Sequence, residues 1–238
     1  MKMTDDKNDY HEFLIKFGKQ AHMDRLINQG EVFLNHVGYF TMLEDDQQRG
    51  DLNEGVTSLR PLSGCSLSIK DEDGALTQVA KFTSGTVRER SQNLENANLF
   101  CLFYLRVPIN QDLKLSEHIP KKNWSGFGDT AVIIYEPNAF LDRLTTAAKG
   151  SGFEITKKLI EYKDLSNHHG QLDPFIKDEQ YIHQQELRAL LWTMPAKTSA
   201  ESVILDLGDL SDISLMLETS TIQESMLRIS DSLPNTSS

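Results

Sequence analysis

The segment Leu99–Val107, LFCLFYLRV, is one of the longest apolar runs in this 238-residue chain. It is dense in aromatic and aliphatic side chains, and Thr130–Tyr135 has the same character. Such runs are typical of strands that are buried on both faces of a sheet. We therefore predict two buried strands. Both runs are far shorter than the roughly 20 apolar residues of a bilayer-spanning helix, so we expect no membrane span.

The N-terminal region predicts a strand, a helix and a second strand. Phe13–Gly18 has the apolar content of a short strand. Apolar side chains then recur at helical spacing as far as Ile27, and Gly30 stands where a helix would end. Glu31–Asn35 is the predicted second strand.

A β-hairpin and a later helix are predicted next. Cys65–Ile69 and Gln78–Phe82 both alternate apolar and polar residues, and Asp71–Gly74 between them has the composition of a turn. Pro137 introduces a segment with apolar residues on one helical face. Further strand-like runs lie at Phe153–Tyr162, Glu186–Trp192 and Val203–Leu207.

The chain contains no internal repeat, low-complexity segment or linker that would mark a domain boundary. We therefore predict a single mixed α+β domain over residues 13–231, with a split, antiparallel-rich β-sheet flanked by helices. Residues 1–12 are predicted to be a frayed N-terminus and residues 232–238 a disordered tail.

The composition restricts the classes of function. Hydrophobic residues make up 39% of the chain, which is enough for a core, and 24 basic against 35 acidic residues give a formal net charge of −11. A broad surface for nucleic acid is therefore not expected. Cys65 and Cys101 are too few for a disulfide framework, and no signal segment opens the chain, so we expect a cytoplasmic protein.

Charged residues cluster around two glycines after the second predicted strand. Arg49, Asp51 and Glu54 surround Gly50 and Gly55, where the backbone can turn sharply and direct the charges into one volume. A solvated loop behind a short helix explains the same pattern. Both interpretations stay open on spacing alone.

The segment Tyr181–Trp192 also has two interpretations. As a strand, it would place Gln184, Glu186 and Arg188 on one face, framed by apolar residues, which is how a strand lines a cleft. Its helix propensity favours instead an amphipathic helix.

Standard catalytic signatures are missing, including the phosphate-binding loop, Gly-x-Ser-x-Gly and His-Glu-x-x-His. The adjacent His168 and His169, with Asp173 and His183, could supply metal ligands. Their spacing matches no metal motif, so we predict no metal site.

The order of short motifs resembles that of a family of uncharacterised bacterial and phage proteins. These begin with a Lys-Phe or Lys-Tyr strand, continue with a helix ending in Gly, an aromatic strand segment and an acidic segment, and end with Tyr-x-x-Gln-x-Glu-x-Arg. The matching positions are Lys16-Phe17, Gly30, 32–35, Tyr39-Phe40, 51–54, Tyr181, Gln184, Glu186 and Arg188. Where that family has Phe-Asn-Asp-Pro-Phe-Glu, this chain has Arg-Gly-Asp-Leu-Asn-Glu.

The same order is similar, more remotely, to the ADP-ribosyltransferase fold. That resemblance implies an enzyme that binds and cleaves NAD+, such as a toxin or a factor in phage–host conflict. It implies that Glu186 is the catalytic carboxylate, which would stabilise oxocarbenium character at the ribose, and that Gln184 contacts the substrate. The implied NAD+-binding residues are Lys16 and Arg49 for the pyrophosphate, Tyr39 and Phe40 for stacking on nicotinamide, and Asn35. We accordingly expect Lys16, Tyr39, Arg49 and Glu186 to converge on one cleft, and Arg188 to pair with an interior carboxylate.

Two other classes of function remain. The first is a non-catalytic phage or mobile-element protein that binds and modulates a host protein, which an acidic surface would suit. The second is a metal-dependent nuclease or hydrolase that holds a divalent ion with Asp51, Glu54 and Glu186.

Overall fold

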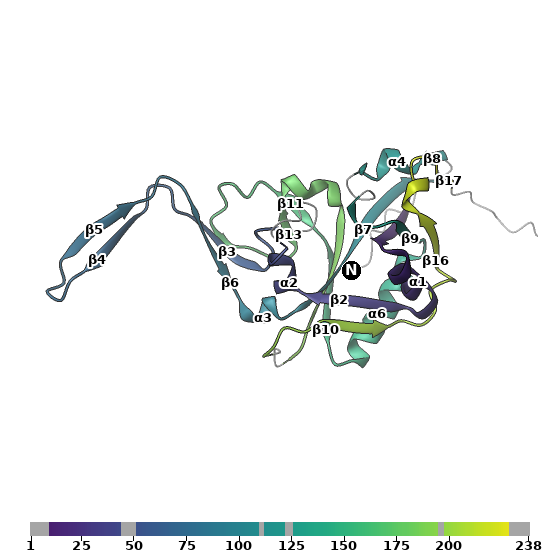
Figure 1. Ribbon diagram of the computed structural model, residues 1–238, viewed down its shortest axis with the longest axis horizontal. Helices are drawn as coiled ribbons and strands as arrows, with labels where there is room; N and C mark the ends of the chain where they lie inside the picture. Colours follow the sequence, from purple (N-terminus) through teal and green to yellow (C-terminus); the bar gives the residue numbers. More distant parts are fainter. Residues whose placement is uncertain (1–9, 44–50, 110–111, 122–125, 195–197, 229–238) are drawn as a thin grey trace, which may run out of the picture.

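An antiparallel sheet of eight strands forms the centre of the protein (Figure 1). The computed structural model describes residues 10–43, 51–109, 112–121, 126–194 and 198–228. The strand order is β10, β14, β7, β1, β9 and β16, and β2 joins β7 and also pairs with β15. These strands are β1 Tyr10–Gly18, β2 Glu31–His36, β7 Asn98–Pro108, β9 Thr130–Ile134, β10 Glu154–Leu159, β14 Glu186–Trp192, β15 Val203–Asp206 and β16 Ser214–Glu218.

Strand β7 is buried on both of its faces and pairs with β1, β14 and β2. Phe100 and Leu102 enter one hydrophobic cluster, while Phe103 and Leu105 enter another. Full burial of a side chain of this size stabilises the fold by roughly 1.5–3 kcal/mol. The prediction of buried strands at 99–107 and 130–135 is confirmed.

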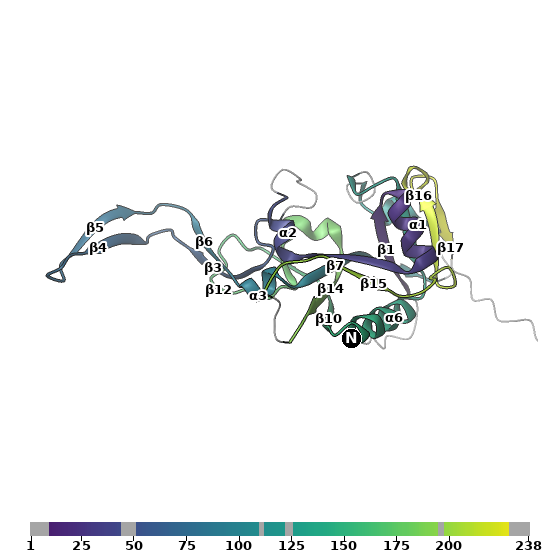
Figure 2. The same ribbon diagram turned by 60° about the horizontal axis from the view of Figure 1, so that its bottom comes forward.

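Two helices cover one face of the sheet. Helix α1, Gln20–Gln29, contributes Met23 and Leu26, and helix α6, Pro137–Gly150, contributes Phe140 and Leu144 to the cluster that contains Leu102. Figure 2 shows α6 running along this side. The opposite face is covered by apolar residues from the segments around β8, Asp112–Lys114, α4, Leu115–His118, and η2, Thr219–Thr221.

Several short elements complete the fold. Of the four smaller sheets in the described residues, one has the order β12, β3, β6, and two others pair β11 with β13 and β17 with β8. Their bounds, with those of the remaining short helices, are α2 Val37–Thr41, β3 Val56–Pro61, β6 Thr86–Arg90, α3 Gln92–Glu95, β11 Glu161–Lys163, β12 Gly170–Gln171, β13 Ile176–Asp178, η1 Glu179–Gln184 and β17 Met226–Arg228. Among the described residues, β11 and β13 pair in parallel, whereas the other strand pairs are antiparallel. The predicted mixed, antiparallel-rich α+β class is therefore confirmed.

The first helix ends as its sequence predicts. Gly30 follows it with φ of 64°, and its N–H donates to the carbonyls of Arg25 and Leu26. A left-handed residue at this position satisfies the last free carbonyls of a helix. Strand β2 then begins directly at Glu31.

The predicted start of the domain at residue 13 is three residues too late. Tyr10, His11 and Glu12 belong to β1 and lie opposite Pro108, Val107 and Arg106 of β7. Their polar composition conceals this pairing, because the ladder hydrogen bonds involve the backbone and not the side chains. Residues 1–9 and the predicted tail, 232–238, lie outside the described residues.

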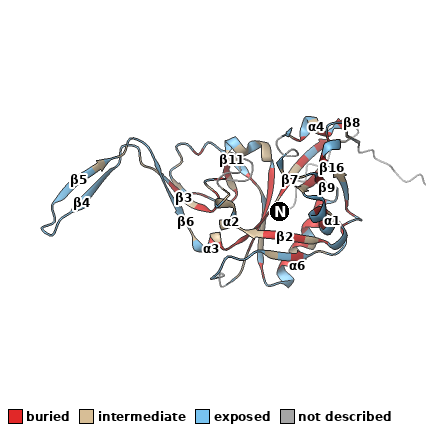
Figure 3. Ribbon diagram, viewed as in Figure 1, coloured by how far each residue is buried: buried red, intermediate tan, exposed pale blue. Residues whose placement is uncertain are grey.

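A long two-stranded arm projects from the body of the protein (Figures 1 and 3). The β3–β6 ladder at its base continues into a hairpin of β4, Ser66–Lys70, and β5, Leu76–Lys81. This is the hairpin that the sequence predicts. Nearly all of its residues are exposed to solvent.

The base of the arm is held by two arginines of β6. The Nε–H of Arg88 donates to Oδ1 of Asn53, and Nη2 of Arg90 donates to the carbonyl of Leu52. Both acceptors belong to one turn of the body, between residues 51 and 55. The arm is therefore fixed to this turn as well as by its own ladder.

The helices are short or amphipathic. Within the described ranges, none combines the length and the apolar character that a membrane crossing demands.

Replacing Gly30 by alanine should destabilise the protein by about 2 kcal/mol or more, because a left-handed alanine is strained and the new Cβ would overlap the backbone of Gly208. Gly150→Ala is the matched control, since nothing lies within 4 Å of the position that its Cβ would take. We expect that control to be neutral or slightly stabilising. Urea denaturation measures both changes, and equal stability of the two variants would contradict this account.

Candidate functional site

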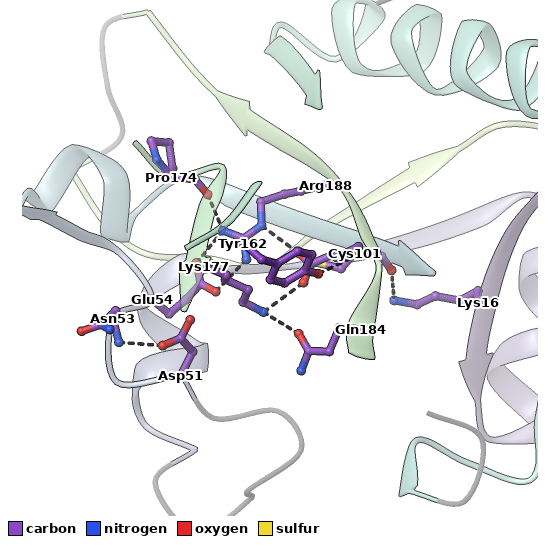
Figure 4. A network of polar contacts seen from close by, with 11 residues as sticks. Lys16, Asp51, Asn53, Glu54, Cys101, Tyr162, Pro174, Lys177, Gln184 and Arg188 are labelled. Carbon is purple, nitrogen blue, oxygen red and sulfur yellow. Dashed lines mark hydrogen bonds and ion pairs between the residues drawn. The ribbon is translucent and has the colours of Figure 1, made fainter. Parts of the chain in front are cut away.

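Four charged side chains from separate parts of the chain meet in the interior of the protein (Figure 4). Glu54 comes from the turn before β3, Lys177 from β13, and Glu186 and Arg188 from β14. All four side chains are buried. We refer to these four residues as the ion cluster.

Arg188 is the centre of the ion cluster. Its Nη1 and Nη2 donate to the two carboxylate oxygens of Glu54 at 2.9 and 2.8 Å, and its Nε donates to Glu186 at 2.8 Å. Nη1 also donates to the carbonyl of Pro174. A guanidinium that binds one carboxylate with two parallel hydrogen bonds is fixed in direction as well as in position. The sequence prediction that Arg188 pairs with an interior carboxylate is confirmed.

Lys177 completes the coordination of Glu186. Its Nζ donates to Oε2 of Glu186 at 2.9 Å and to Oε1 of Gln184 at 2.8 Å. Burial opposes the charge of Glu186, but Arg188 and Lys177 outweigh it and hold the pKa of the carboxyl well below its usual range. Glu186 is therefore ionised, and each of its oxygens accepts a hydrogen bond from a cation.

Strained backbone brings Gln184 and Glu186 to the same lysine. Between them Gln185 has φ of 40°, the left-handed conformation, where η1 ends and β14 begins. Such a conformation is uncommon for a residue other than glycine. The side chains of Gln184 and Glu186, on either side of this residue, both reach Lys177.

A side-chain-stabilised turn directs Glu54 inward. Oδ1 of Asp51 accepts the N–H of Asn53 at 2.8 Å, and the carbonyl of Asp51 accepts the N–H of Glu54 at 2.9 Å. Aspartate commonly nucleates turns in this way. Gly55 follows with φ of 71°, beside Val37. The expected inward turn of the acidic segment is observed for Glu54.

Among the described residues, Asp51 is a third carboxyl group beside the two cations of the ion cluster. The two carboxylates of Glu54 and Glu186 already balance the cations Lys177 and Arg188. Burial, and then the nearby charge of Glu54, raise the pKa of Asp51 above its ordinary value. Its negative charge is therefore unfavourable in the folded protein.

Tyr162 and Cys101 border the ion cluster. The hydroxyl oxygen of Tyr162 accepts the backbone N–H of Glu186 at 3.0 Å, and burial together with Glu186 raises the pKa of this tyrosine to about 12. Burial and Glu186 also raise the pKa of the Cys101 thiol far above its usual range. A thiol that stays protonated is a poor nucleophile, so Cys101 has a packing role.

Lys16 lies on the other face of the sheet from Glu186. Its Nζ is 4.4 Å from the centre of the Phe100 ring and donates to the carbonyl of Cys101 at 2.8 Å. Phe100 belongs to the cluster under α6, together with Leu187, whereas Glu186 points to the opposite face by the alternation of β14. The expected convergence of Lys16 and Glu186 on one cleft is therefore not observed.

Three of the other residues implied for NAD+ lie in β2 and α2. Tyr39 makes edge-to-face contacts with His36 and Phe40, and Phe40 packs onto a hydrophobic cluster near β14. Asn35 lies in β2 opposite Leu99. Arg49 lies outside the described residues.

The structure also decides between the two interpretations of residues 181–192. Glu186–Trp192 is a strand, whereas Glu179–Gln184 is a short 3₁₀ helix. The predicted shared face therefore begins at Glu186 and excludes Gln184, which reaches the ion cluster from the helix.

Lys177 and Tyr162 are the members of this region that the sequence did not indicate. Lys177 stands between Ile176 and Asp178, and Tyr162 between Glu161 and Lys163, with no motif around either residue. Only the fold brings them to Glu186.

The histidine-rich segment shows ordinary backbone contacts. A ring nitrogen of His168 lies 3.0 Å from the carbonyl of Gln171, and one of His183 lies 3.2 Å from that of Gln180. In the part of the chain that the structure describes, no three His, Cys, Asp or Glu residues are grouped to hold a metal ion.

Comparisons of this chain with protein-family models, with curated proteins and with solved structures gave no significant match. The resemblance to phage proteins and to ADP-ribosyltransferases therefore stays a prediction from short motifs.

Replacing Glu186 by glutamine should destabilise the protein by about 3–5 kcal/mol at neutral pH, because Arg188 and Lys177 lose a buried counter-charge. The pKa of Glu186 is lower in the folded than in the unfolded chain, so its stabilisation is complete above the ordinary glutamate pKa. The difference in free energy of unfolding between the parent and Glu186→Gln should then become smaller as the pH falls below that pKa. Glu161→Gln, at an exposed pair with Lys163, is the control and should change little. Urea midpoints that stay equal for parent and Glu186→Gln would contradict a structural role.

Urea denaturation of Asp51→Asn should show the opposite effect, a gain of stability at neutral pH. The pKa of Asp51 is raised on folding, so its charge costs stability at neutral pH, and asparagine keeps the oxygen that accepts the N–H of Asn53. We expect a stabilised variant whose advantage begins to shrink as the pH falls through the folded-state pKa of Asp51 and is gone below the ordinary aspartate pKa, where the carboxyl is protonated in both states. A destabilised Asp51→Asn would show that this charge is balanced after all.

Proposed function

We propose that this protein is a binding module that acts by contacting another protein, and that the β4–β5 arm is its recognition element. The observation that supports this most directly is the exposure of Leu67, Ile69 and Val79 on the arm. Figure 3 shows the arm as exposed and projecting from the body of the protein. The partner class that we propose is a host protein, in keeping with the resemblance to phage proteins.

The register of the hairpin separates its two faces. Leu67 lies opposite Ala80 and Ile69 opposite Thr77, so these four share one face. The register shift between Leu67 and Ser68 adds Val79 to that face, because Gln78 points away with Ser68. We refer to Leu67, Ile69, Thr77, Val79 and Ala80 as the apolar face of the arm.

The opposite face of the arm is polar. It carries Ser66, Ser68, Lys70, Gln78 and Lys81, with Leu76 as an isolated apolar residue. A ribbon with one apolar and one polar face has the pattern of a strand pair that is covered on one side. Here neither side is covered by the described residues of the chain.

An uncovered apolar face is costly for a free hairpin. Leu67, Ile69 and Val79 are 52%, 59% and 49% exposed. A two-stranded hairpin is at best marginally stable in water, and contiguous exposed apolar surface commonly marks a protein-interaction site. Contact with a partner chain would both stabilise the arm and bury this surface.

The charge of the arm favours protein over nucleic acid as the partner. Its tip carries Asp71, Glu72 and Asp73, and the whole chain has a net charge of −11. Phosphate groups would be repelled by this tip. A β-ribbon that enters a nucleic-acid groove carries cations where this arm carries carboxylates.

NAD+-dependent ADP-ribosyl transfer is the second candidate function. It is favoured by the meeting of Glu54, Gln184 and Glu186, from separate segments, around Lys177 and Arg188. If NAD+ binds, Glu186 is the residue that would supply a carboxylate to the ribose. It would first have to exchange its hydrogen bonds with buried cations for bonds to substrate, which is why we place this function second.

A third hypothesis, the divalent-ion hydrolase, fits less well. Glu54 and Glu186 direct their carboxylates at Arg188, which takes the position between them. A metal ion there would have to displace a guanidinium.

The binding function is tested with Leu67→Thr/Ile69→Thr, which removes the two largest apolar side chains of the apolar face while keeping residues that suit strands. The control is Leu76→Thr, a like change at a 71% exposed leucine on the polar face. Tagged parent and variants are compared by in-cell crosslinking, and the partner identified is then purified and titrated. We expect binding to be lost in the double variant and kept in the control. Equal binding by the parent and both variants would show that the arm is not the recognition element.

The transferase function is tested by incubating the parent and Lys177→Met with NAD+ and measuring released nicotinamide. Our proposal predicts no release and no thermal shift by NAD+. If the parent releases nicotinamide and a folded Lys177→Met variant does not, ADP-ribosyl transfer becomes the first candidate function and the binding module the second.

A further inference from the structure

We infer that the protein binds one structural water molecule in a small cavity at the start of β7, where the water joins the side chains of Asn98 and Thr193. This inference concerns neither the arm nor the ion cluster, so it goes beyond the proposed function. Its grounds are two buried oxygen atoms that have no partner among the described residues, and a cavity that both residues line.

Asn98 is the first residue of β7 and connects three segments of the chain. Its backbone lies opposite Leu191 of β14 and His36 of β2. Its side-chain Nδ2 donates to the carbonyl of Glu201 at 2.6 Å and to that of Leu34 at 3.4 Å. Because both partners are acceptors, the amide nitrogen has to face them, and Oδ1 is left as an acceptor on the other branch of the amide.

Oδ1 of Asn98 is a buried acceptor without a donor. Asn98 is only 1% exposed, and no described residue donates a hydrogen bond to this oxygen. Oγ1 of Thr193, the residue that follows β14, is also buried and has no partner in the same part of the chain. Buried polar atoms in folded proteins are nearly always paired with another protein group or with ordered water, because an unmade hydrogen bond is costly.

The cavity beside these two residues has the size of one water molecule. Its volume is about 10 Å³, which is about the space that a single water needs and far too little for an organic ligand. The apolar part of its lining is formed by Ala97, Phe153, Leu191 and Trp192.

The lining of the cavity favours water over an ion. Its other polar residues are Asn93 and Asn96, so all the described residues around it are uncharged. An anion would meet the acceptor Oδ1 of Asn98, and a cation such as Ca²⁺ takes roughly six or more oxygen ligands. A water molecule donates one hydrogen to Oδ1 and makes its second hydrogen bond with the Thr193 hydroxyl, which can donate or accept.

The water extends the connections that Asn98 makes. Through Glu201 and Leu34, Asn98 already holds the segment before β15 and strand β2. The water adds Thr193 to this set of contacts. It thereby links the end of β14 to the start of β7 beyond the last pair of their ladder, Leu191 and Asn98.

The first test is a high-resolution crystal structure of the full chain. We expect one isolated peak of electron density within hydrogen-bond distance of both Oδ1 of Asn98 and Oγ1 of Thr193. A direct hydrogen bond between these two atoms, with no peak beside them, would overturn the inference. A peak surrounded by roughly six close oxygens would also overturn it, because that peak would be a cation.

The second test is nuclear magnetic resonance of the full chain in solution. The methyl group of Ala97, which lines the cavity, should show a nuclear Overhauser effect to water. The methyl group of Ala189 is the control, because it is equally buried but lies outside the lining, and it should show none. Absence of the effect at Ala97 in the parent protein would contradict a bound water.

A pair of variants tests the part played by the hydroxyl group. Thr193→Val removes the second partner of the water and should abolish the effect at Ala97, whereas Thr193→Ser keeps a hydroxyl and should retain it. Circular-dichroism melts show whether both variants are folded, and the two measurements on the parent decide the matter if one is not. An undiminished effect in folded Thr193→Val would overturn the bridge to Thr193. The crystal structure distinguishes a bound water from simple exchange of the Thr193 hydroxyl proton with bulk solvent.

Discussion

The structure depends on how one buried guanidinium is neutralised. Arg188 lies in a strand whose neighbours bury both of its faces, where an unpaired charge would cost several kcal/mol. It is tolerated because Glu54, 134 residues away in sequence, and Glu186 on its own strand both accept its hydrogen bonds. The turn before β3, the segment around Pro174 and β14 are thereby held in one mutual arrangement.

The hydrogen bonds of Arg188 are separate from the hydrophobic core but lie beside it. Strand β7 gives Phe100 and Leu102 to the helices on one face, while Leu99 packs on the other face with Leu190 of β14. Apolar packing fixes how close these layers come and tolerates small shifts, whereas the hydrogen bonds of Arg188 demand one register. The two kinds of interaction together give the sheet both stability and a single alignment.

The sequence predicted the parts of the fold that local chemistry determines. The end of α1 at Gly30, the hairpin around Gly74 and the buried runs at β7 and β9 each have a signal within a few residues. The order of strands in the sheet had no such signal, because it depends on pairings between distant segments. The start of β1 was missed for the same reason.

The candidate site was predictable only in part. Glu54 was indicated by its glycine-flanked turn and Arg188 by its place among apolar residues, and the two form a pair. Helix propensity misled at Glu186–Trp192, because β14 is held as a strand by β7 and β10. The strand interpretation was wrong at Gln184, which lies in η1 before the left-handed Gln185. Lys177 had no local signal, since a lone lysine becomes a counter-ion only through tertiary contacts.

The anchoring of the arm has a mechanical consequence. Arg88 and Arg90 attach its base to Asn53 and Leu52, next to the residue that neutralises Arg188. The arm acts as a lever, and the turn that carries Glu54 is its pivot. A force applied to the far end of the arm is therefore transmitted to the turn whose Glu54 pairs with the buried Arg188. The same few peptide units thus hold the arm in place and keep the buried ion pair in register.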